Sequence, residues 1–515
     1  MIDVLFINPN NAIKIYQDLA KKYSAIETPT WALLLAESCR SKGFSVDILD
    51  CLAENLNEEE ILNRVIKKNP RLIVFVVYGQ NVNAGTTSMS GATKISLYLK
   101  KNKIKSLIAY IGSHVQALPV QTLKKEISID FVFTNEGVYA LHNILIKKDI
   151  TLEKIKHING IAIKINGKIF FNNPEKIVPQ ERMDLDLPGY AWDLLPYKKK
   201  PLDLYRSPMW HAEYHDEKRS PYAAIQTSLG CQFKCSFCMI NIVNRNNQDE
   251  VGVASNYSGM RFWSTDFVIK EFDKLLDMGV KTIRIVDEMF LLNPKYYTPL
   301  CKELAARNKN DELRIWAYSR IDTVKNPEVL NLVRSAGLKW LCLGIESADK
   351  QVRLEVSKGK FEEVDVKKVI KQVHDSGIEV MANYIFGLPG DTKDTIKKTL
   401  DLSKELCTSG WNTYAAMALP GSQLYKEAVD KGYALPDDYE GYSFHSYNTQ
   451  NLPTETLKDY QILKLRDEAF IEYHTHIPFL ERIKNRFGEA AKKNIIEMTK
   501  IKLNRKIIED NEGLF

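Results

Sequence analysis

The sequence predicts an α/β protein made of two successive α/β units and a helical tail. Short apolar runs alternate with helix-like stretches over the first 150 residues, and the alternation resumes after residue 221. Such strands are typical of parallel sheets covered by helices. We therefore expect a doubly wound, Rossmann-like domain (1–150), a linker with a β-hairpin (151–220), a second α/β domain (221–430) and a small, mainly helical cap (431–515).

The first unit contains five strand candidates. They lie at 4–7, 45–49, 72–77, 107–111 and 131–133, with helices near 31–42, 57–68, 90–101 and 137–147. Ligands of doubly wound sheets bind at the carboxyl ends of the strands. Polar, glycine-bearing loops are expected at three of these ends, at 78–88, 112–114 and 135–137. Backbone amides in such loops suit phosphate-bearing or amide-rich ligands.

Composition and charge describe an ordinary globular protein. The 515 residues are 44% apolar and 26% charged, enough for two to four domains. The 71 basic and 65 acidic residues, a net charge of +6, are spread along the chain and favour a solvated surface over a nucleic-acid-binding one. No signal peptide is evident, and no apolar run approaches the ~20 residues that span a bilayer. We expect a cytoplasmic protein.

Three of the eight cysteines form a C-x3-C-x2-C motif, Cys231, Cys235 and Cys238. One tight loop can bring their sulfurs to a single soft metal centre. Closed zinc or iron–sulfur sites normally use four protein ligands, and no nearby cysteine or histidine supplies a fourth. An iron with an open position is therefore indicated, with three core cysteines or a zinc knuckle as alternatives. The other five cysteines are scattered singly and predict buried thiols instead of disulfides.

This motif, with Phe237 before its last cysteine, resembles the radical S-adenosylmethionine (SAM) superfamily. The resemblance implies that the three cysteines hold a 4Fe-4S cluster and that SAM chelates the fourth iron. Six strand candidates, at 222–226, 281–286, 313–317, 340–344, 379–385 and 411–417, match that family's partial (β/α)6 barrel, with helices near 265–278, 295–307, 326–336, 362–375 and 392–407. Its chemistry is expected at the strand C-termini.

The same resemblance assigns polar residues at the strand ends to SAM. It implies carboxylates for the methionyl ammonium, a polar or basic pair for its carboxylate, ribose contacts and an adenine-binding turn. Arg320 can instead pair with Asp322 or Asp287, and acids after strands often cap the next helix. The SAM-binding residues implied are Phe237, Asp287, Glu288, Ser319, Arg320, Glu346, Ser347, Phe386 and Gly387.

The loops of the first unit resemble the cobalamin-binding domain found in front of many radical SAM enzymes. One departure is that residues 8–12 read Asn-Pro-Asn-Asn-Ala, whereas the histidine-ligating class has Asp-x-His-x-x-Gly. The resemblance then implies cobalamin without histidine below the cobalt; a degenerate Rossmann-like domain that only docks is the alternative. The cobalamin-binding residues implied are Gln80, Asn81, Thr86, Ser88, Gly112, Ser113, His114, Glu136 and Gly137.

The linker and tail carry fewer signals. Asn166–Gly167 between two β-rich runs predicts a hairpin at 161–171. Aromatic residues stud the linker as anchors, with a substrate role as the alternative. The tail is expected to cap the barrel mouth. Three of its residues can line a substrate cavity or simply pack: Tyr442, His445 and Tyr447.

The family resemblance implies a two-stage reaction on a small-molecule substrate. The reduced cluster cleaves SAM to a 5'-deoxyadenosyl radical that abstracts hydrogen from an unactivated carbon, and methylcobalamin then donates a methyl group. An external electron donor of the flavodoxin or ferredoxin type is implied. The alternatives are rearrangement, cyclisation or oxidation without methyl transfer and, more distantly, tRNA modification or a non-catalytic cofactor sensor.

Overall fold

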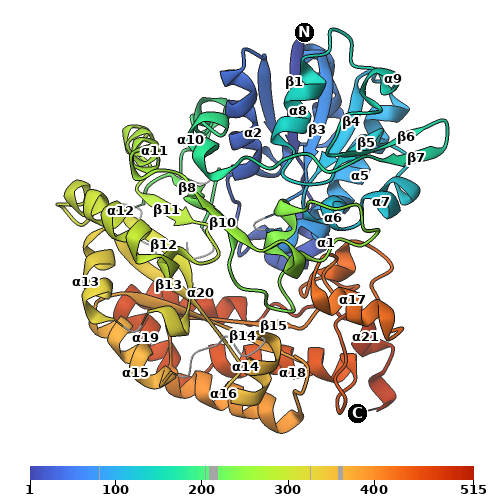
Figure 1. Cartoon of the computed structure of the whole chain (residues 1–515). Helices are drawn as coiled ribbons and strands as arrows, with labels where there is room; N and C mark the ends of the chain where they lie inside the picture. The colour runs from blue at the N-terminus through green and yellow to red at the C-terminus, as the bar shows by residue number, and fades with distance from the viewer. Residues whose placement is uncertain (80–81, 203, 208–218, 325, 358–363, 515) are drawn as a thin grey trace.

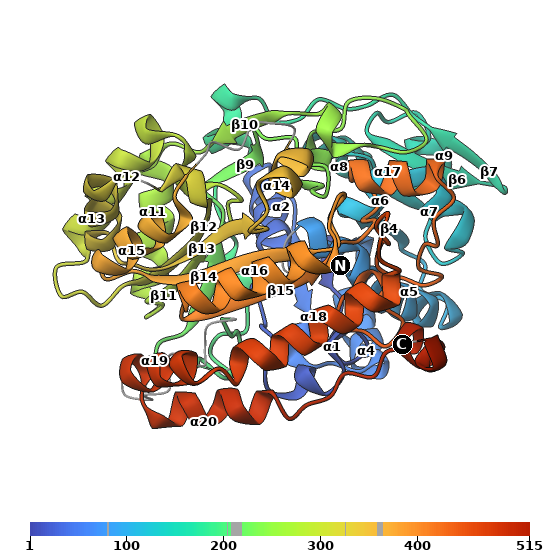
Figure 2. The ribbon, with the colours of Figure 1, turned by 90° about the horizontal axis from the view of Figure 1, so that it is seen from below.

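The computed structural model describes residues 1–79, 82–202, 204–207, 219–324, 326–357 and 364–514. Gln80 and Asn81, two of the expected cobalamin-binding residues, lie outside the described residues. Two α/β units lie side by side (Figure 1), and the C-terminal helices run along one side of both of them (Figure 2). Within the described ranges, no helix is both long enough and apolar enough to cross a bilayer.

The N-terminal unit is a seven-stranded sheet in the order β2-β1-β3-β4-β5-β6-β7. Strands β1 to β5 pair in parallel, and β6 and β7 continue the sheet as an antiparallel hairpin. The predicted hairpin thus forms, and the sheet runs past the domain boundary expected at residue 150. The strands are β1 (Ile2–Asn8), β2 (Val46–Asp50), β3 (Pro70–Val76), β4 (Leu107–Ile111), β5 (Phe131–Phe133), β6 (Ile161–Ile165) and β7 (Lys168–Phe171).

Both faces of this sheet are buried, as expected of a doubly wound domain. Val4 and Phe6 of β1 enter one core with helices α2 (Thr30–Ser41) and α8 (Val138–Leu145), whereas Leu5 and Ile7 enter a second core. That second core contains residues of α4 (Glu58–Lys68), α5 (Gly85–Lys101) and α7 (Pro119–Lys125). Shorter helices complete the unit: α1 (Ala12–Tyr16), α3 (Cys51–Glu54), α6 (Ser113–Ala117) and α9 (Leu152–Ile155).

Local sequence fixes where the helices begin. Helix α4 starts at a capping box formed by Asn57 and Glu60, with acidic residues in its first turn and Lys67 and Lys68 in its last. Both ends therefore complement the helix dipole. Side chains also cap six helices of the second unit, where Ser264, Asn293, Asn326, Asp365, Thr392 and Ser422 each accept a backbone N–H at the helix start.

The linker holds the two units together through buried aromatic residues. The Tyr197 hydroxyl donates to the Tyr222 carbonyl at 2.8 Å, and the Tyr205 hydroxyl donates to Asp50 Oδ2 at 2.9 Å. The Trp192 indole donates to Glu271 at 3.0 Å, beside the short helix α10 (Met183–Asp186). These aromatic residues therefore anchor the linker, which was the first interpretation; a substrate role was the alternative.

The second unit is a six-stranded, all-parallel sheet in the order β15-β14-β13-β12-β11-β8. This confirms the expected half-barrel. Its strands are β8 (Tyr222–Ile225), β11 (Thr282–Ile285), β12 (Arg314–Arg320), β13 (Leu338–Glu346), β14 (Glu379–Phe386) and β15 (Gly410–Ala415). Its helices are α11 (Thr265–Asp277), α12 (Pro294–Arg307), α13 (Pro327–Ser335), α14 (Lys350–Ser357), α15 (Val366–Asp375), α16 (Lys393–Leu406) and α17 (Gln423–Asp430).

A small antiparallel ribbon, β9 (Ser228–Cys231) with β10 (Gly259–Phe262), follows the first barrel strand. The sequence analysis did not anticipate it, because the β9 residues were interpreted as a loop. Gly230 occupies the left-handed region at φ +84°, and a Cβ there would lie 2.1 Å from the Gly259 carbonyl oxygen. Only glycine allows the two chains of this ribbon to approach so closely.

The tail is helical, as predicted, and it contacts the turn after β14 as well as an edge strand and the N-terminal side of the barrel. Its helices are α18 (Asp459–His474), α19 (Ile477–Phe487), α20 (Glu489–Met498) and α21 (Lys506–Glu509). Helix α18 packs against β15, the last strand of the sheet, where Arg466 donates to the Thr413 carbonyl at 2.9 Å (Figure 2). At the N-terminal end of β14, Glu379 pairs with Arg482 and Arg486, and Phe487 stacks on Trp340. The tail therefore shields an edge strand and the bottom of the barrel.

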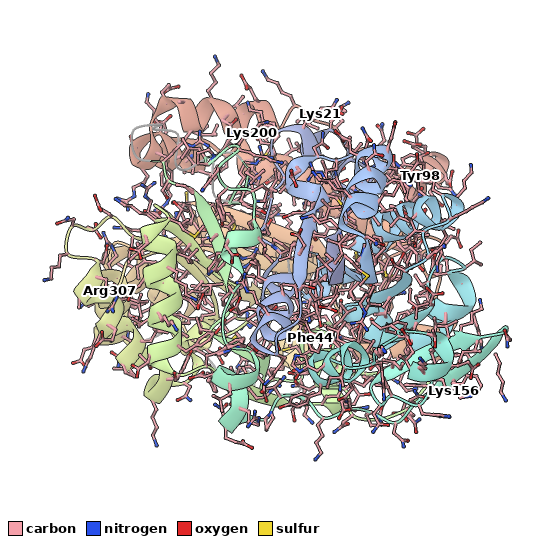
Figure 3. All side chains as sticks on the ribbon, turned by 90° about the horizontal axis from the view of Figure 1, so that it is seen from above. Lys21, Phe44, Tyr98, Lys156, Lys200 and Arg307 are labelled. Carbon is pink, nitrogen blue, oxygen red and sulfur yellow. The ribbon has the colours of Figure 1, made fainter. Side chains whose placement is uncertain are left out.

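Positive charge is spread over the surface. In the view of Figure 3, Arg307 and Lys156 lie on opposite sides of the molecule, and Lys21 and Lys200 lie together on a third side. Arg307 is paired with Asp273 and Glu303. This distribution agrees with the solvated surface inferred from the sequence.

Candidate active site

The three cysteines of the motif lie on one loop at the carboxyl end of the barrel sheet. Cys231 ends β9, and Cys235 and Cys238 follow it as free thiols. Asn241 braces the loop: its Oδ1 accepts the Cys231 N–H at 2.8 Å, and its Nδ2 donates to the Cys231 carbonyl at 2.9 Å. The Phe233 N–H donates to Cys231 Sγ at 3.5 Å.

The charges of two carboxylates, Glu288 and Glu346, act on these thiols. Burial is the main cause that raises the pKa of Cys231 to about 11 and that of Cys235 to about 12, and the charge of Glu288 or Glu346, respectively, contributes to each value. The pKa of Cys238 is raised by burial, by Glu288 and by the other two thiols. In the part of the chain that is described, no three such side chains surround a single ion. In a 4Fe-4S cluster each thiolate binds a different iron, so three spaced sulfurs suit a cluster better than zinc.

An irregular end of strand β13 sets the direction of the Glu346 side chain. The register of β13 shifts between Gly344 and Glu346, and Glu346 occupies the left-handed region at φ +64°. A Cβ on Gly344 would lie 2.5 Å from Glu346 Oε1, so the glycine leaves room for the carboxylate. Bulges and left-handed non-glycine residues often re-aim side chains at functional sites.

Glu288 and Glu346 are half-buried, and neither makes a side-chain hydrogen bond or ion pair within the described residues. Burial raises the pKa of each to about 7, and nearby arginines, Arg284 for Glu288 and Arg320 for Glu346, act in the opposite direction. A cationic ligand would favour their ionised forms. Glu288 and Glu346 therefore both remain candidates for binding a cationic ligand.

Asp287 is used differently from what the family resemblance implied. Its carboxylate accepts the Thr227 N–H, the Thr227 hydroxyl and the Ser228 hydroxyl, all at 2.6 Å. These bonds tie β11 to the start of the cysteine ribbon. Asp287 therefore supports the loop, and Glu288 is left as the carboxylate of this pair that can meet a ligand.

Three other expected SAM contacts are also engaged within the protein. Arg320 forms a two-bond pair with Asp322 at 2.5 and 2.6 Å, the alternative foreseen from the sequence, and stacks on Phe233. The Ser319 hydroxyl lies 2.7 Å from the Thr323 hydroxyl. Ser347 is fully buried and accepts the Asp349 N–H at 3.1 Å. These hydrogen bonds hold the carboxyl ends of strands β12 and β13 in place.

The expected adenine-binding turn lies where β14 ends. Phe386 is buried, and Gly387 adopts φ +81° while its N–H donates to Asp391 Oδ2 at 3.0 Å. A Cβ on Gly387 would lie 2.9 Å from Ile462 of α18, so the tail covers this turn. Phe237 is half-buried and packs against neighbouring apolar residues.

At the carboxyl edge of the N-terminal sheet, three helices begin without a side-chain cap. They are α5, which begins at Gly85, α6, preceded by Gly112, and α8, preceded by Gly137. Uncapped helix N-termini offer backbone N–H groups and a positive dipole to ligand oxygens. Their shared position suits a ligand that is rich in amide and phosphate groups. Cobalamin is such a ligand.

The side chains expected to bind cobalamin are mostly engaged elsewhere. The Ser113 hydroxyl donates to the Val82 carbonyl at 2.6 Å, and Thr86 Oγ1 lies 3.2 Å from His114 Nδ1. His114 also packs edge-on against Tyr439, and burial lowers its pKa to about 3. Ser88 remains half-buried and makes no side-chain hydrogen bond in the described chain.

Glu136 joins the two units instead of facing a ligand. It is fully buried, and its carboxylate forms a 2.7 Å ion pair with Arg261 of β10 and accepts the Val178 N–H. Its own N–H donates to the Val243 carbonyl at 3.1 Å. A cobalamin contact by Glu136 stays a prediction, and its carboxylate is occupied by Arg261 and the Val178 N–H in this structure.

The sequence analysis missed Asn83. This residue belongs to the loop after β3, and its Oδ1 accepts the Met239 N–H at 3.0 Å while its Nδ2 lies 3.8 Å from Cys238 Sγ. No pattern in the sequence connects Asn83 with the cysteine loop, because the contact spans more than 150 residues.

The three expected substrate residues have different surroundings. His445 lies between Tyr16 and Phe444, with ring centroids 5.3 and 4.1 Å away, and its buried Nδ1 has no hydrogen-bond partner among the described residues. Tyr442 is half-buried. Tyr447 is 42% exposed and donates to Glu509, so it belongs to the surface and not to an interior cavity.

Comparison with protein families identifies both units. Residues 225–403 match the radical SAM superfamily, and residues 16–145 match the B12 binding domain. The chain therefore combines a radical SAM domain with a B12-binding domain. These two domains imply a 4Fe-4S cluster, SAM and cobalamin as its cofactors.

Several relatives cover most of the chain. An uncharacterized methyltransferase of Pyrococcus horikoshii is 26% identical over 87% of this chain and 88% of its own length. An anaerobic magnesium-protoporphyrin IX monomethyl ester cyclase of Cereibacter sphaeroides is 22% identical over 86% of this chain and 66% of its own. The structure of TsrM, a radical SAM methyltransferase from Kitasatospora setae with cobalamin and a 4Fe-4S cluster bound, has a TM-score of 0.63 at 15% identity, over 96% of this chain and 99% of that one. This likeness shows the shared fold.

Proposed function

We propose that this enzyme methylates an unactivated carbon of a small-molecule substrate. The observation that carries the proposal is the meeting of three free cysteines and two unpaired carboxylates, Glu288 and Glu346, at the end of the barrel sheet that contacts the B12-binding domain through Asn83. The name of the Pyrococcus horikoshii relative supports methyl transfer.

In this proposal Cys231, Cys235 and Cys238 hold the cluster as thiolates. Glu288 and Glu346 bind the cationic part of SAM, because each carboxylate lies in the site without a protein cation bonded to it. Gly387 and its turn cover the nucleoside. When bound, the cluster and SAM supply the radical that removes hydrogen, and cobalamin supplies the methyl group.

The chain's own work is positioning and exclusion of water. Uncapped helices α5, α6 and α8 hold the corrin by backbone N–H groups. The substrate lies between the two units, beside Tyr16, Tyr442 and His445. The partial burial of these residues limits the access of solvent to the radical. An external electron donor of the flavodoxin or ferredoxin type reduces the cluster.

Anaerobic reconstitution with iron, sulfide and cobalamin tests this function. Candidate small molecules are supplied with SAM and a reductant, and 5'-deoxyadenosine, S-adenosylhomocysteine and product mass are measured. We expect both SAM-derived products together and a substrate heavier by one methyl group. The Cys235→Ser variant is the matched control and should yield neither product.

A second candidate is cyclisation without methyl transfer, which the name of the Cereibacter sphaeroides relative favours. The same assay separates the two. Formation of 5'-deoxyadenosine without S-adenosylhomocysteine, and a product without an added methyl group, would support cyclisation or a related rearrangement and reject methylation.

A further inference from the structure

Asn83 connects the B12-binding domain to a cluster cysteine. Its Oδ1 accepts the Met239 N–H at 3.0 Å, so the oxygen of the side-chain amide must face Met239. The Nδ2 group is then turned toward Cys238 Sγ, 3.8 Å away. The orientation of the amide is therefore fixed by the backbone N–H.

The loop that carries Asn83 is firmly held. It forms the 3-10 turn Val82–Ala84 between β3 and α5. The buried Ser113 hydroxyl donates to the Val82 carbonyl at 2.6 Å, and a Cβ on Gly79 would lie 2.8 Å from the Ala84 carbonyl oxygen. The same loop leads into α5, one of the uncapped helices at the proposed corrin site. Asn83 is thus positioned by the corrin-binding side of the molecule.

A hydrogen-bond donor that points at a cluster thiolate changes the reduction potential of the cluster. Reduction adds negative charge to the iron and its sulfur ligands, and an N–H dipole pointing at sulfur stabilises that charge. Hydrogen bonds to the ligand sulfurs are one of the means by which a protein raises the reduction potential of an iron–sulfur cluster. A second N–H···S contact, from the Phe233 N–H to Cys231 Sγ, arises inside the cysteine loop itself.

We propose that Asn83 is a positioning residue through which the B12-binding domain holds Cys238 and raises the reduction potential of the cluster. This inference rests on the proposed function, because it requires the three cysteines to hold a cluster. The donated hydrogen bond makes the cluster easier to reduce, and the accepted one fixes the backbone after the last cysteine.

The test is a redox titration of the reconstituted cluster, followed by electron paramagnetic resonance, in the full-length protein and three variants. Asn83→Leu removes the donor and the acceptor while keeping the size of the side chain. Asn83→Asp keeps the acceptor for Met239 and removes the donor. Asn241→Asp makes the same chemical change in the cysteine loop at a residue whose hydrogen bonds go to backbone atoms of Cys231 and Phe233.

We expect both Asn83 variants to lower the midpoint potential, with the reduced fraction at the wild-type midpoint falling severalfold; a tenfold change in the equilibrium corresponds to about 59 mV for one electron. Asn241→Asp should change the iron content more than the potential. An unchanged potential in Asn83→Leu, a wild-type potential in Asn83→Asp, or an equal shift in Asn241→Asp would each overturn the inference. Failure of the wild-type protein to assemble a cluster would instead reject the proposed function.

Discussion

At the scale of single residues, the site depends on side chains whose charge is not neutralised by the protein. Arg284 is paired with Glu27 and Arg320 with Asp322, whereas Glu288 and Glu346 have no such partner in the described chain. A carboxylate without a cation is costly to bury, and the raised pKa values express that cost. The cost is offset when a cationic ligand binds.

The cysteines give the first prediction. Substitution of Cys231, Cys235 or Cys238 by serine should remove most of the reconstituted iron and sulfide, because each thiolate supplies one of only three protein ligands. Iron content and visible absorption check this. Cys407→Ser is the control, since this half-buried thiol ends α16 outside the motif and should retain the cluster. Equal iron loading in all four variants would contradict the assignment.

The second prediction concerns SAM. Glu346→Gln should weaken SAM binding by roughly 10- to 100-fold, because an interaction with a charged group contributes about 1.5–3 kcal/mol. Equilibrium dialysis under anaerobic conditions measures this without turnover. Glu405→Gln, at a surface ion pair with Lys367, is the control and should bind like the wild type. Unchanged affinity in Glu346→Gln would remove this residue from the SAM site.

At the scale of elements, helix contacts in the N-terminal unit depend on groups that must stay in one protonation state. His142 of α8 lies 3.1 Å from the Ser38 hydroxyl of α2, and that hydroxyl donates to the Asp186 carbonyl at 2.5 Å. Burial, with a smaller contribution from Lys42, lowers the pKa of His142 to about 4. Burial at the junction of α2, α8 and α10 therefore favours the neutral imidazole.

The third prediction follows from this histidine. Its folded pKa lies below the unfolded value of 6.5, so the unfolded chain binds more protons, and stability falls as the pH drops from about 6.5 toward 4. At pH 5 the loss is about 2 kcal/mol relative to pH 7. Urea unfolding at both pH values checks this, with His142→Gln expected to lose less stability. The same loss in both proteins would assign the effect to other groups.

The tail shows what could be predicted about elements and what could not. The mainly helical tail expected over 431–515 is confirmed by α18 and the helices that follow it. Its place in the fold was not predicted, because covering the edge strand β15 depends on contacts such as Arg466 with the Thr413 carbonyl. The β9–β10 ribbon was missed because its strands have four residues each, too few for a reliable alternation.

At the scale of the whole molecule, buried polar contacts join the two units. Glu136 and Arg261 form an ion pair with 0% and 8% of their side chains exposed, and Arg261 also donates to Val178 and Asn244. On the other side, the Thr28 hydroxyl donates to the Ala224 carbonyl and accepts the Ala224 N–H, which satisfies the edge strand β8. The proposed corrin and cluster sites are held between these contacts.

The fourth prediction concerns the docking of the units. Arg261→Met should destabilise the protein by about 3–5 kcal/mol, because it leaves the buried Glu136 carboxylate without its partner. Denaturant unfolding and limited proteolysis between the units check this. Arg307→Met removes partly exposed ion pairs with Asp273 and Glu303 and should have an effect below about 1 kcal/mol. Equal effects of the two substitutions would contradict the proposed role of Arg261.

The sequence alone determined the class of protein. Apolar periodicity and the spacing of Cys231, Cys235 and Cys238 are local properties, so they predicted two α/β units and a metal-binding loop. Only the tertiary structure decided which polar residues remain for ligands. Asp287 and Glu288 are neighbours in the chain, yet the first is bonded to Thr227 and Ser228 and the second is not. The physical reason is that hydrogen-bond partners are assigned by packing between distant segments, as Asn83 with Met239 and Glu136 with Arg261 also show.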